Sequence, residues 1–181
     1  GAHGAHPENG IDPIVVGAQV VTALQSVVSR NVRPRDAAVV SITQFHAGDA
    51  YNVIPASAHL SGTVRTFSNS VMTHIQERMQ VLAESTAQGY GATATFDFRD
   101  IFHPVVNDEV QSSFAASVCA GLVGEDNVHV NLPPGTGSED FSFMLEKVPG
   151  CYLLIGNGDG DAGHPVHHPS YDFNDDASVH G

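Results

Sequence analysis

Positive charge is scarce in this chain. Lys147 is the one lysine, and seven lysines and arginines stand against 20 aspartates and glutamates, which gives a formal net charge of −13 at pH 7. Binding of nucleic acid or of an anionic membrane through a basic patch needs the opposite balance, so we expect neither partner. Apolar residues make up 41% of the 181 residues, which is enough for the core of one domain or of two small ones.

Cysteines and long hydrophobic runs are also few. The two cysteines, Cys119 and Cys151, do not make a disulfide framework, so we expect core thiols in a reducing compartment and a cytoplasmic protein. No apolar run approaches the roughly 20 residues that span a bilayer. There is neither an initiator methionine nor a signal peptide, and we expect the chain to be a fragment that is cut at both ends.

Helical and strand periodicities alternate over the first half of the chain. Asp12 is a good N-cap, and the apolar positions that follow it form two adjacent stripes without a charge before Arg30. This width predicts a core helix buried on more than one side, with one face available to a subunit interface. After a loop over residues 1–10, the predicted order is a helix from Pro13, strands at 38–46 and 58–66, a helix from Ser68 to Gly89 or Gly91, and a strand at 92–98.

This order is typical of a split βαβ domain. If a further strand precedes residue 1, residues 1–98 form an antiparallel sheet with two helices on one side. Within the strand at 58–66, alternation puts Leu60 and Val64 on the buried face and Arg65 on the polar face. The guanidinium of Arg65 is then free to reach a ligand or water.

Residues 99–181 have a different composition and a less regular pattern. The predicted elements are a helix at 108–122, a short strand at 127–131, a short helix from Ser138 to about Leu145, a buried strand at 151–156 and the start of a helix at 175–181. The strand at 151–156 is apolar on both faces and needs cover from other elements. We therefore expect this part to be an incomplete domain.

Three imidazoles lie within five residues at 164–168, in a stretch that also holds two prolines and several carboxylates. Prolines make the stretch a stiff loop, and imidazole is the commonest protein ligand of transition metals. A polar surface loop and a metal site are equally good interpretations of the spacing alone. His164 and His168 are too close to His167 to complete a ligand sphere unaided.

Five stretches that follow one another along the chain resemble a known family. They are GAHGAHPENGIDPI at 1–14, VTALQSVVSRNV at 21–32, YNVIPASAHLSGTVRTF at 51–67, GSEDFSFML at 137–145 and HPVHHPSYDFND at 164–175. The family is that of the co-catalytic metallopeptidases, which includes aminoacylases and glutamate carboxypeptidases. Within it, the chain is most similar to hippurate hydrolases, auxin-conjugate hydrolases and N-acetyldiaminopimelate deacetylases.

The resemblance implies a fold and a cofactor. Residues 1–98 would be a ferredoxin-like lid that pairs with a second lid to make a homodimer, without its first strand. Residues 99–181 would be the C-terminal part of an α/β catalytic domain. Members of the family hold two divalent metals per subunit, usually zinc or manganese, and hydrolyse N-acyl amino acids.

The resemblance also implies roles for three residues of the lid. His3 matches a histidine that reaches across the dimer and stabilises the oxyanion of the tetrahedral intermediate in the partner's site. Asn52 and Arg65 match residues that hold the polar groups of the substrate. The planar guanidinium of Arg65 suits the substrate carboxylate, which it can bind in bidentate fashion.

In the second part, His167 matches a metal-ligating histidine, and Glu139 with Asp140 matches an acidic pair near the metals. The other metal ligands of the family and its general base belong to a segment that precedes the lid. One ligand and no base are therefore expected here, and the chain alone should be inactive. The alternatives are a non-catalytic fragment that only dimerises and a small ferredoxin-like binding module.

Overall fold

The computed structural model describes residues 1–135, 137–158 and 164–180. The chain divides into two compact units. Unit 1 consists of residues 1–104 together with 137–138, and unit 2 holds the other described residues.

Helix α1 (Pro13–Ser26) starts where the sequence predicts. The Asp12 carboxylate accepts a 2.8 Å hydrogen bond from the backbone N–H of Ile14, which satisfies one of the free donors of the first turn. The helix runs on into a π-helical turn, η2 (Val27–Asn31). Its buried side consists of Val16, Gly17, Val20, Leu24 and Val27. Ile14 and Val15 remain 43% and 49% exposed, so only one side of the helix is buried within the chain.

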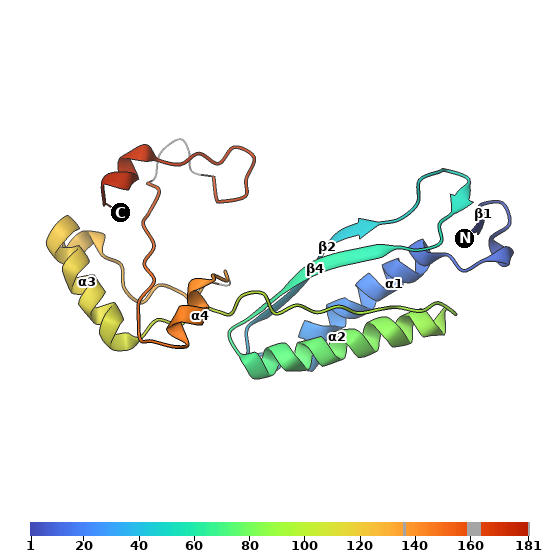
Figure 1. Cartoon of the computed structure of the whole chain (residues 1–181), viewed down its shortest axis with the longest axis horizontal. Coiled ribbons are helices and arrows are strands. Elements are labelled where there is room, and N and C mark those ends of the chain that lie inside the picture. The colour runs from blue at the N-terminus through green and yellow to red at the C-terminus, as the bar shows by residue number, and fades with distance from the viewer. Residues whose placement is uncertain (136, 159–163, 181) are drawn as a thin grey trace. The chain divides into compact units, whose positions relative to one another are not determined.

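Strands β2 (Ala38–His46) and β4 (His59–Thr66) form an antiparallel pair. Helices α1 and α2 (Asn69–Gly89) lie side by side on one face of this pair (Figure 1). The core between the layers is built by Val20, Leu24, Val27, Val71, Ile75, Met79 and Ala83, against which Val40, Ile42, Leu60 and Val64 pack from the strands. The predicted alternation in β4 is confirmed.

The sequence did not predict two short strands. Strand β1 (Ala2–His3) pairs antiparallel with β3 (Val53–Ile54), and a 3-10 turn, η1 (Pro7–Asn9), follows β1. The prediction of a loop over residues 1–10 is therefore wrong at β1. Two-residue strands are too short to show any periodicity.

The prediction of a strand at 92–98 is wrong, but the predicted alternation of buried and exposed side chains is present. Ala92, Ala94, Phe96 and Phe98 are half-buried while the residues between them are exposed, and Phe96 packs against the core. No backbone hydrogen bond joins residues 93–98 to another described residue. An extended segment forms a β-strand only when its backbone hydrogen-bonds to a neighbouring strand. No described strand pairs with residues 93–98.

Unit 2 contains helix α3 (Glu109–Val123), as predicted, and otherwise only short elements. These are η3 (Glu125–Asn127), α4 (Phe141–Leu145) and η4 (Asp175–His180). The predicted strands at 127–131 and 151–156 are wrong: both stretches are irregular, and Leu154 is 82% exposed. The helix expected from Ser138 begins at Phe141, and the helix expected at 175–181 is a 3-10 helix, with residue 181 outside the described part.

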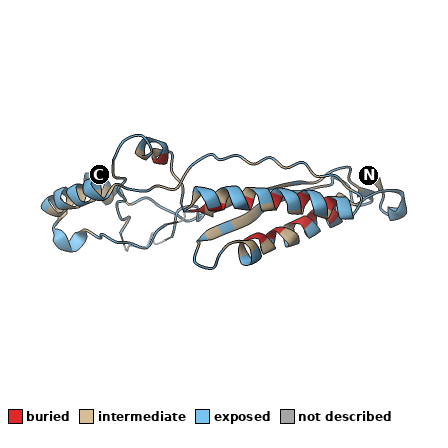
Figure 2. Cartoon of the chain, turned by 90° about the horizontal axis from the view of Figure 1, so that it is seen from below, coloured by how far each residue is buried: buried red, intermediate tan, exposed pale blue. Residues whose placement is uncertain are grey.

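Burial separates the two units. Figure 2 shows buried residues along the inner sides of α1 and α2, whereas unit 2 is almost entirely exposed or half-buried. The thiols of Cys119 and Cys151 are free and half-buried. None of the described helices is long and apolar enough to cross a membrane.

Candidate functional site

His3 lies at the end of unit 1 where β1 pairs with β3, opposite Val53. Its Nδ1 accepts a 3.1 Å hydrogen bond from the backbone N–H of Ala5. In the neutral ring the proton must then sit on Nε2, so the exposed edge of the imidazole is a hydrogen-bond donor. The ring of His6 lies beside it, with the ring centroids 5.9 Å apart, and Nδ1 of His6 is 3.3 Å from a Glu8 carboxylate oxygen.

Asn52 belongs to the same end of the unit. Its backbone carbonyl accepts a 2.7 Å hydrogen bond from Gly4, directly after His3. A Cβ atom at position 4 would lie 3.3 Å from that carbonyl oxygen, a tight contact that glycine avoids. The exposed side-chain amide of Asn52 has no hydrogen-bond partner among the described residues.

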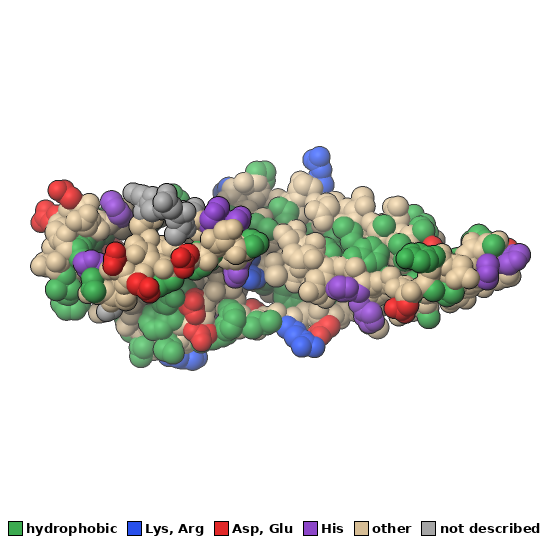
Figure 3. Space-filling model, turned by 90° about the horizontal axis from the view of Figure 1, so that it is seen from above, with side chains coloured by type: hydrophobic (Ala, Val, Ile, Leu, Met, Phe, Trp, Pro, Cys, Tyr) green, Lys and Arg blue, Asp and Glu red, His purple; other side chains and the backbone are tan. Residues whose placement is uncertain are grey.

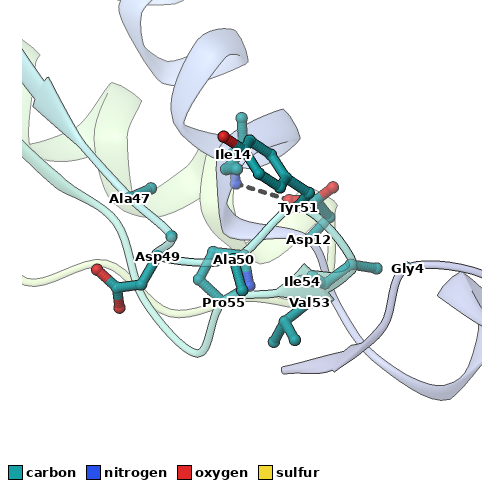
Figure 4. A pocket seen from close by; sticks show the side chains of 11 residues that line it. Gly4, Asp12, Ile14, Ala47, Asp49, Ala50, Tyr51, Val53, Ile54 and Pro55 are labelled. Atoms are coloured by element: carbon teal, nitrogen blue, oxygen red, sulfur yellow. Dashed lines mark hydrogen bonds between the residues drawn. The ribbon is translucent and has the colours of Figure 1, made fainter.

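A hollow of about 440 Å³ adjoins these residues (Figure 4). Its walls are Gly4, Asp12, Ile14, residues 47–51 and residues 53–55. The Asp12 carboxylate in its wall is already engaged as the helix cap. Figure 3 shows histidine side chains at the tip of the unit nearest the N-terminus.

Arg65 lies at the other end of β4, one residue before the buried Thr66, and is half-buried. Its register partner is Val39, and its Nη1 donates a 2.9 Å hydrogen bond to the carbonyl of Val64. The guanidinium forms no ion pair with a described carboxylate, and strands β2 and β4 contain no aspartate or glutamate. The remaining donors of the guanidinium can therefore bind an anion.

The structure separates two residues that the resemblance placed together. Asn52 stands with His3, whereas Arg65 lies at the opposite end of the sheet (Figure 1). Arg65 lies six positions along β4 from His59, at the near end of the strand, which corresponds to about 20 Å at the usual rise. Within one chain these groups do not form a single site.

Glu139 and Asp140 precede α4 in unit 2. One carboxylate oxygen of Glu139 accepts a 3.0 Å bond from the Asp140 backbone N–H, and the other accepts a 3.2 Å bond from the hydroxyl of Tyr152. This hydrogen bond, together with the negative charge of Glu139, raises the pKa of Tyr152 above its ordinary value. The tyrosine contact, which was not predicted, orients the Glu139 carboxylate.

His167 has an unusual backbone. The N–H of His168 bonds to the carbonyl of Pro165 at 3.1 Å, which makes His167 the third residue of a tight turn, with φ 73°. Glycine is preferred at such a position because a Cβ atom is strained there. Non-glycine residues in this region often mark functional sites.

The imidazole of His167 is exposed and makes no hydrogen bond to a described residue, so it can serve as one nitrogen ligand. Nothing in the described ranges brings three His, Cys, Asp or Glu side chains together around a point that could hold a metal ion. His164 and His168 stack on each other, with ring centroids 4.0 Å apart, rather than converging with His167. The residues fit one ligand of a metal site and not a complete site.

Comparison with known proteins identifies the family. The sequence profile of peptidase family M20/M25/M40 matches residues 2–180. The chain belongs to this family. A member of the family with a solved structure, the Bacillus subtilis YxeP protein, is described as a dinuclear metal-binding peptidase; it is 36% identical, with a TM-score of 0.67 over 96% of this chain and 44% of that chain. The mixed helices and small sheets are thus those of M20 structures.

Two similar curated proteins are named as a deacetylase and a hydrolase. N-acetylcysteine deacetylase of Bacillus subtilis strain 168 is 40% identical over 98% of this chain and 45% of its own length. Hippurate hydrolase of Campylobacter jejuni is 35% identical over 97% of this chain and 45% of its own length. The chain spans less than half the length of these relatives.

Proposed function

We propose that the protein containing this chain is a metal-dependent amidohydrolase that splits N-acyl amino acids into a carboxylate and a free amino acid. The observation that carries the proposal is the 40% identity to N-acetylcysteine deacetylase, which extends over 98% of the chain. Unit 1 is proposed as the lid and dimerisation domain, and unit 2 as the C-terminal part of the catalytic domain. Two divalent ions, zinc or manganese, would polarise the amide carbonyl and supply a nucleophilic water.

His3 is proposed to stabilise the oxyanion that forms when the amide carbonyl is attacked. Its Nε2 is the donor edge of the ring because Nδ1 is occupied by the Ala5 N–H. A donor that is already oriented costs no reorganisation when charge develops on the oxygen. Support for the role comes from the exposure of this edge at the tip of unit 1.

Arg65 is proposed to bind the carboxylate of the amino-acid product. Support comes from the strands around it, which carry no acidic residue in a chain with a formal net charge of −13. Asn52 is proposed to hold a second polar group of the substrate through its free amide. In the catalytic part, His167 is proposed as a metal ligand, and Glu139 with Asp140 as groups that orient ligands.

We propose that two copies combine through unit 1, because His3 and Asn52 of one chain lie far from its own Arg65. The exposed side of α1 is suited to such a contact. It presents Ile14 and Val15 and has no charged residue between Asp12 and Arg30, whereas α2 carries Glu77 and Glu84 on its outer side. Uncharged apolar surface is favoured at the centre of homodimer interfaces.

Hydrolysis by the whole protein tests the enzymatic proposal. We expect the zinc- or manganese-loaded protein to release free amino acid from N-acetylcysteine or hippurate and a chelator to abolish this. His3→Gln should lower kcat by about a hundredfold or more, the usual effect of losing one oxyanion donor. His6→Gln, which removes the neighbouring ring, is the matched control and should retain activity. No hydrolysis of any N-acyl amino acid by the metal-loaded protein would refute the proposal.

Two valines test the dimer. Val15 on α1 and Val81 on α2 are 49% and 48% exposed, so their replacement by glutamate should perturb the fold equally. We expect Val15→Glu to yield monomers in analytical ultracentrifugation and Val81→Glu to leave the dimer intact. A dimer that survives both changes would place the interface elsewhere. If the 181-residue chain dimerises but the whole protein hydrolyses nothing, the non-catalytic alternative holds.

A further inference from the structure

Two asparagines in unit 2 replace strand pairing with side-chain hydrogen bonds. The amide of Asn107 donates to the carbonyl of Tyr152 at 3.0 Å and accepts from the N–H of the same residue at 2.8 Å. The amide of Asn157 donates to the carbonyl of Asp172 at 2.9 Å and accepts from the N–H of Asn174 at 2.8 Å. Each amide thus satisfies one backbone donor and one acceptor, as a neighbouring strand would.

The Asn157 amide holds the end of the segment that carries His167. From Asp172 back to His167 the chain is fixed by local bonds, since the N–H of Tyr171 bonds to the carbonyl of His168 at 2.9 Å. The N–H of Ser170 also bonds to Nδ1 of His168, at 3.0 Å. These short-range bonds make residues 165–171 a pair of linked turns, and Asn157 joins the chain directly after them to residues 151–158.

Residues 157–158 and Asn174 lie in close contact. Gly158 has φ 83°, and a Cβ atom there would lie 3.1 Å from the Asn174 side-chain amide. Asn174 also accepts a 3.1 Å bond from the N–H of Asp176 and so links the tie to η4. Asn157 and Asn174 are half-buried, whereas most of their neighbours are exposed.

We propose that Asn157 is a positioning residue for His167. The strained φ of His167 persists only if the surrounding chain over-determines it, and the two hydrogen bonds of Asn157 join this segment to residues 151–158. Outer-shell partners that fix a ligand typically change metal affinity 10- to 100-fold when they are removed. The inference rests on the proposed role of His167 as a ligand.

Asn107 provides a matched control, because it makes the same two kinds of bond without contacting the His167 segment. In the whole protein, we expect Asn157→Ala to raise the amide exchange rate of Asn174 by about tenfold or more and to leave that of Tyr152 unchanged. Asn107→Ala should do the reverse. Metal affinity, measured by zinc titration, should fall at least about tenfold in Asn157→Ala and change less than about twofold in Asn107→Ala.

The two readouts separate this inference from the proposed function. If the wild type binds no zinc but Asn157→Ala still selectively exposes the Asn174 amide, the tie exists and His167 is not a ligand. If the wild type binds zinc and both asparagine variants lower the affinity equally, Asn157 acts only through general stability and the inference is wrong. An unchanged exchange rate at Asn174 would also overturn it.

Discussion

Helices α2 and α3 carry the same hydrophobic pattern with opposite outcomes. In α2, apolar residues four apart, Val71, Ile75, Met79 and Ala83, are between 0% and 8% exposed. In α3, apolar residues four apart, Val110, Phe114, Val118 and Leu122, are between 46% and 77% exposed. The spacing makes one apolar face in both helices, and only α2 has α1 and the β2–β4 pair to cover it. Amphipathic spacing therefore predicts a helix and not its burial.

The comparison extends to the two units. All nine buried hydrophobic side chains among the described residues lie in unit 1, and Ser142 is the one buried residue of unit 2. Both non-glycine residues with positive φ in the described ranges, Asn131 and His167, belong to unit 2. Unit 1 thus derives its stability from packing, while unit 2 is held by hydrogen bonds such as those of Asn107 and Asn157.

The largest expected difference in the free energy of unfolding comes from truncating one side chain on the apolar face of α2 and one on that of α3. Ile75→Ala removes a fully buried side chain and should lower the free energy of unfolding by about 2–5 kcal/mol. Leu122 is 77% exposed, and Leu122→Ala should cost less than about 0.5 kcal/mol. Urea unfolding of the 181-residue chain measures both. Equal losses would mean that α3 is covered in solution, for instance by a second copy.

A change at the strained turn should have the opposite sign. His167→Gly relieves the positive φ and should stabilise unit 2 by about 1 kcal/mol, even though it removes a side chain. Val166→Gly, next to it in the same turn, removes an exposed side chain without such relief and is the control. Amide exchange of residues 164–174 measures the effect. If His167→Gly destabilises the loop instead, the imidazole makes contacts that hold it.

Removing the N-cap of α1 or of α3 tests the difference between the two units, because each cap contributes about 1 kcal/mol to the stability of its helix. Asp12 caps α1 through the Ile14 N–H at 2.8 Å, and Asp108 caps α3 through the Gln111 N–H at 3.0 Å. Asp12→Ala should lower the midpoint of cooperative unfolding, because α1 is part of the core. Asp108→Ala should leave that midpoint in place and speed exchange only in the first turn of α3. A shared shift would show that the two units unfold together.

The smallest expected effect depends on pH and belongs to unit 2. The Tyr152 hydroxyl donates to Glu139, which raises the pKa of the tyrosine in the folded chain above its ordinary value of 10.0. The contribution of this hydrogen bond to the stability of unit 2 is therefore present below pH 10 and is lost as the pH rises through the folded pKa of Tyr152. Tyr152→Phe should remove this alkaline loss without changing the pH dependence of unit 1. Amide exchange around residues 139–145 between pH 9 and 11 provides the measurement.

The sequence predicted the parts of the fold whose signal is local. The start of α1, the pair β2 and β4, and the helices α2 and α3 follow from caps and from periodicity. The stretches at 92–98 and 151–156 have strand-like patterns but no ladder, because a ladder depends on a neighbour that the pattern does not specify. The prediction was weakest where an element needs a partner from elsewhere.

The candidate site divides in the same way. Residue types were predictable from motifs, but the grouping of Asn52 with His3 depends on the β1–β3 pairing, which has no periodic signal. The same is true of the Tyr152–Glu139 bond and of the asparagine ties, which span 13 to 45 positions of sequence. A side-chain amide that replaces a strand leaves no trace in composition.

One irregularity of β2 sets how the chain tolerates changes in length. The register passes from Ile42 opposite Gly62 to Gln44 opposite Ser61, so Thr43 has no partner. Because Thr43 is surplus to the ladder, deleting it would leave each remaining side chain of β2 on its present face. Deleting Ser61 from β4 would instead move every side chain on one side of the deletion to the opposite face of the sheet. Insertions and deletions are therefore asymmetric across this pair: one strand holds a spare residue, and its neighbour does not.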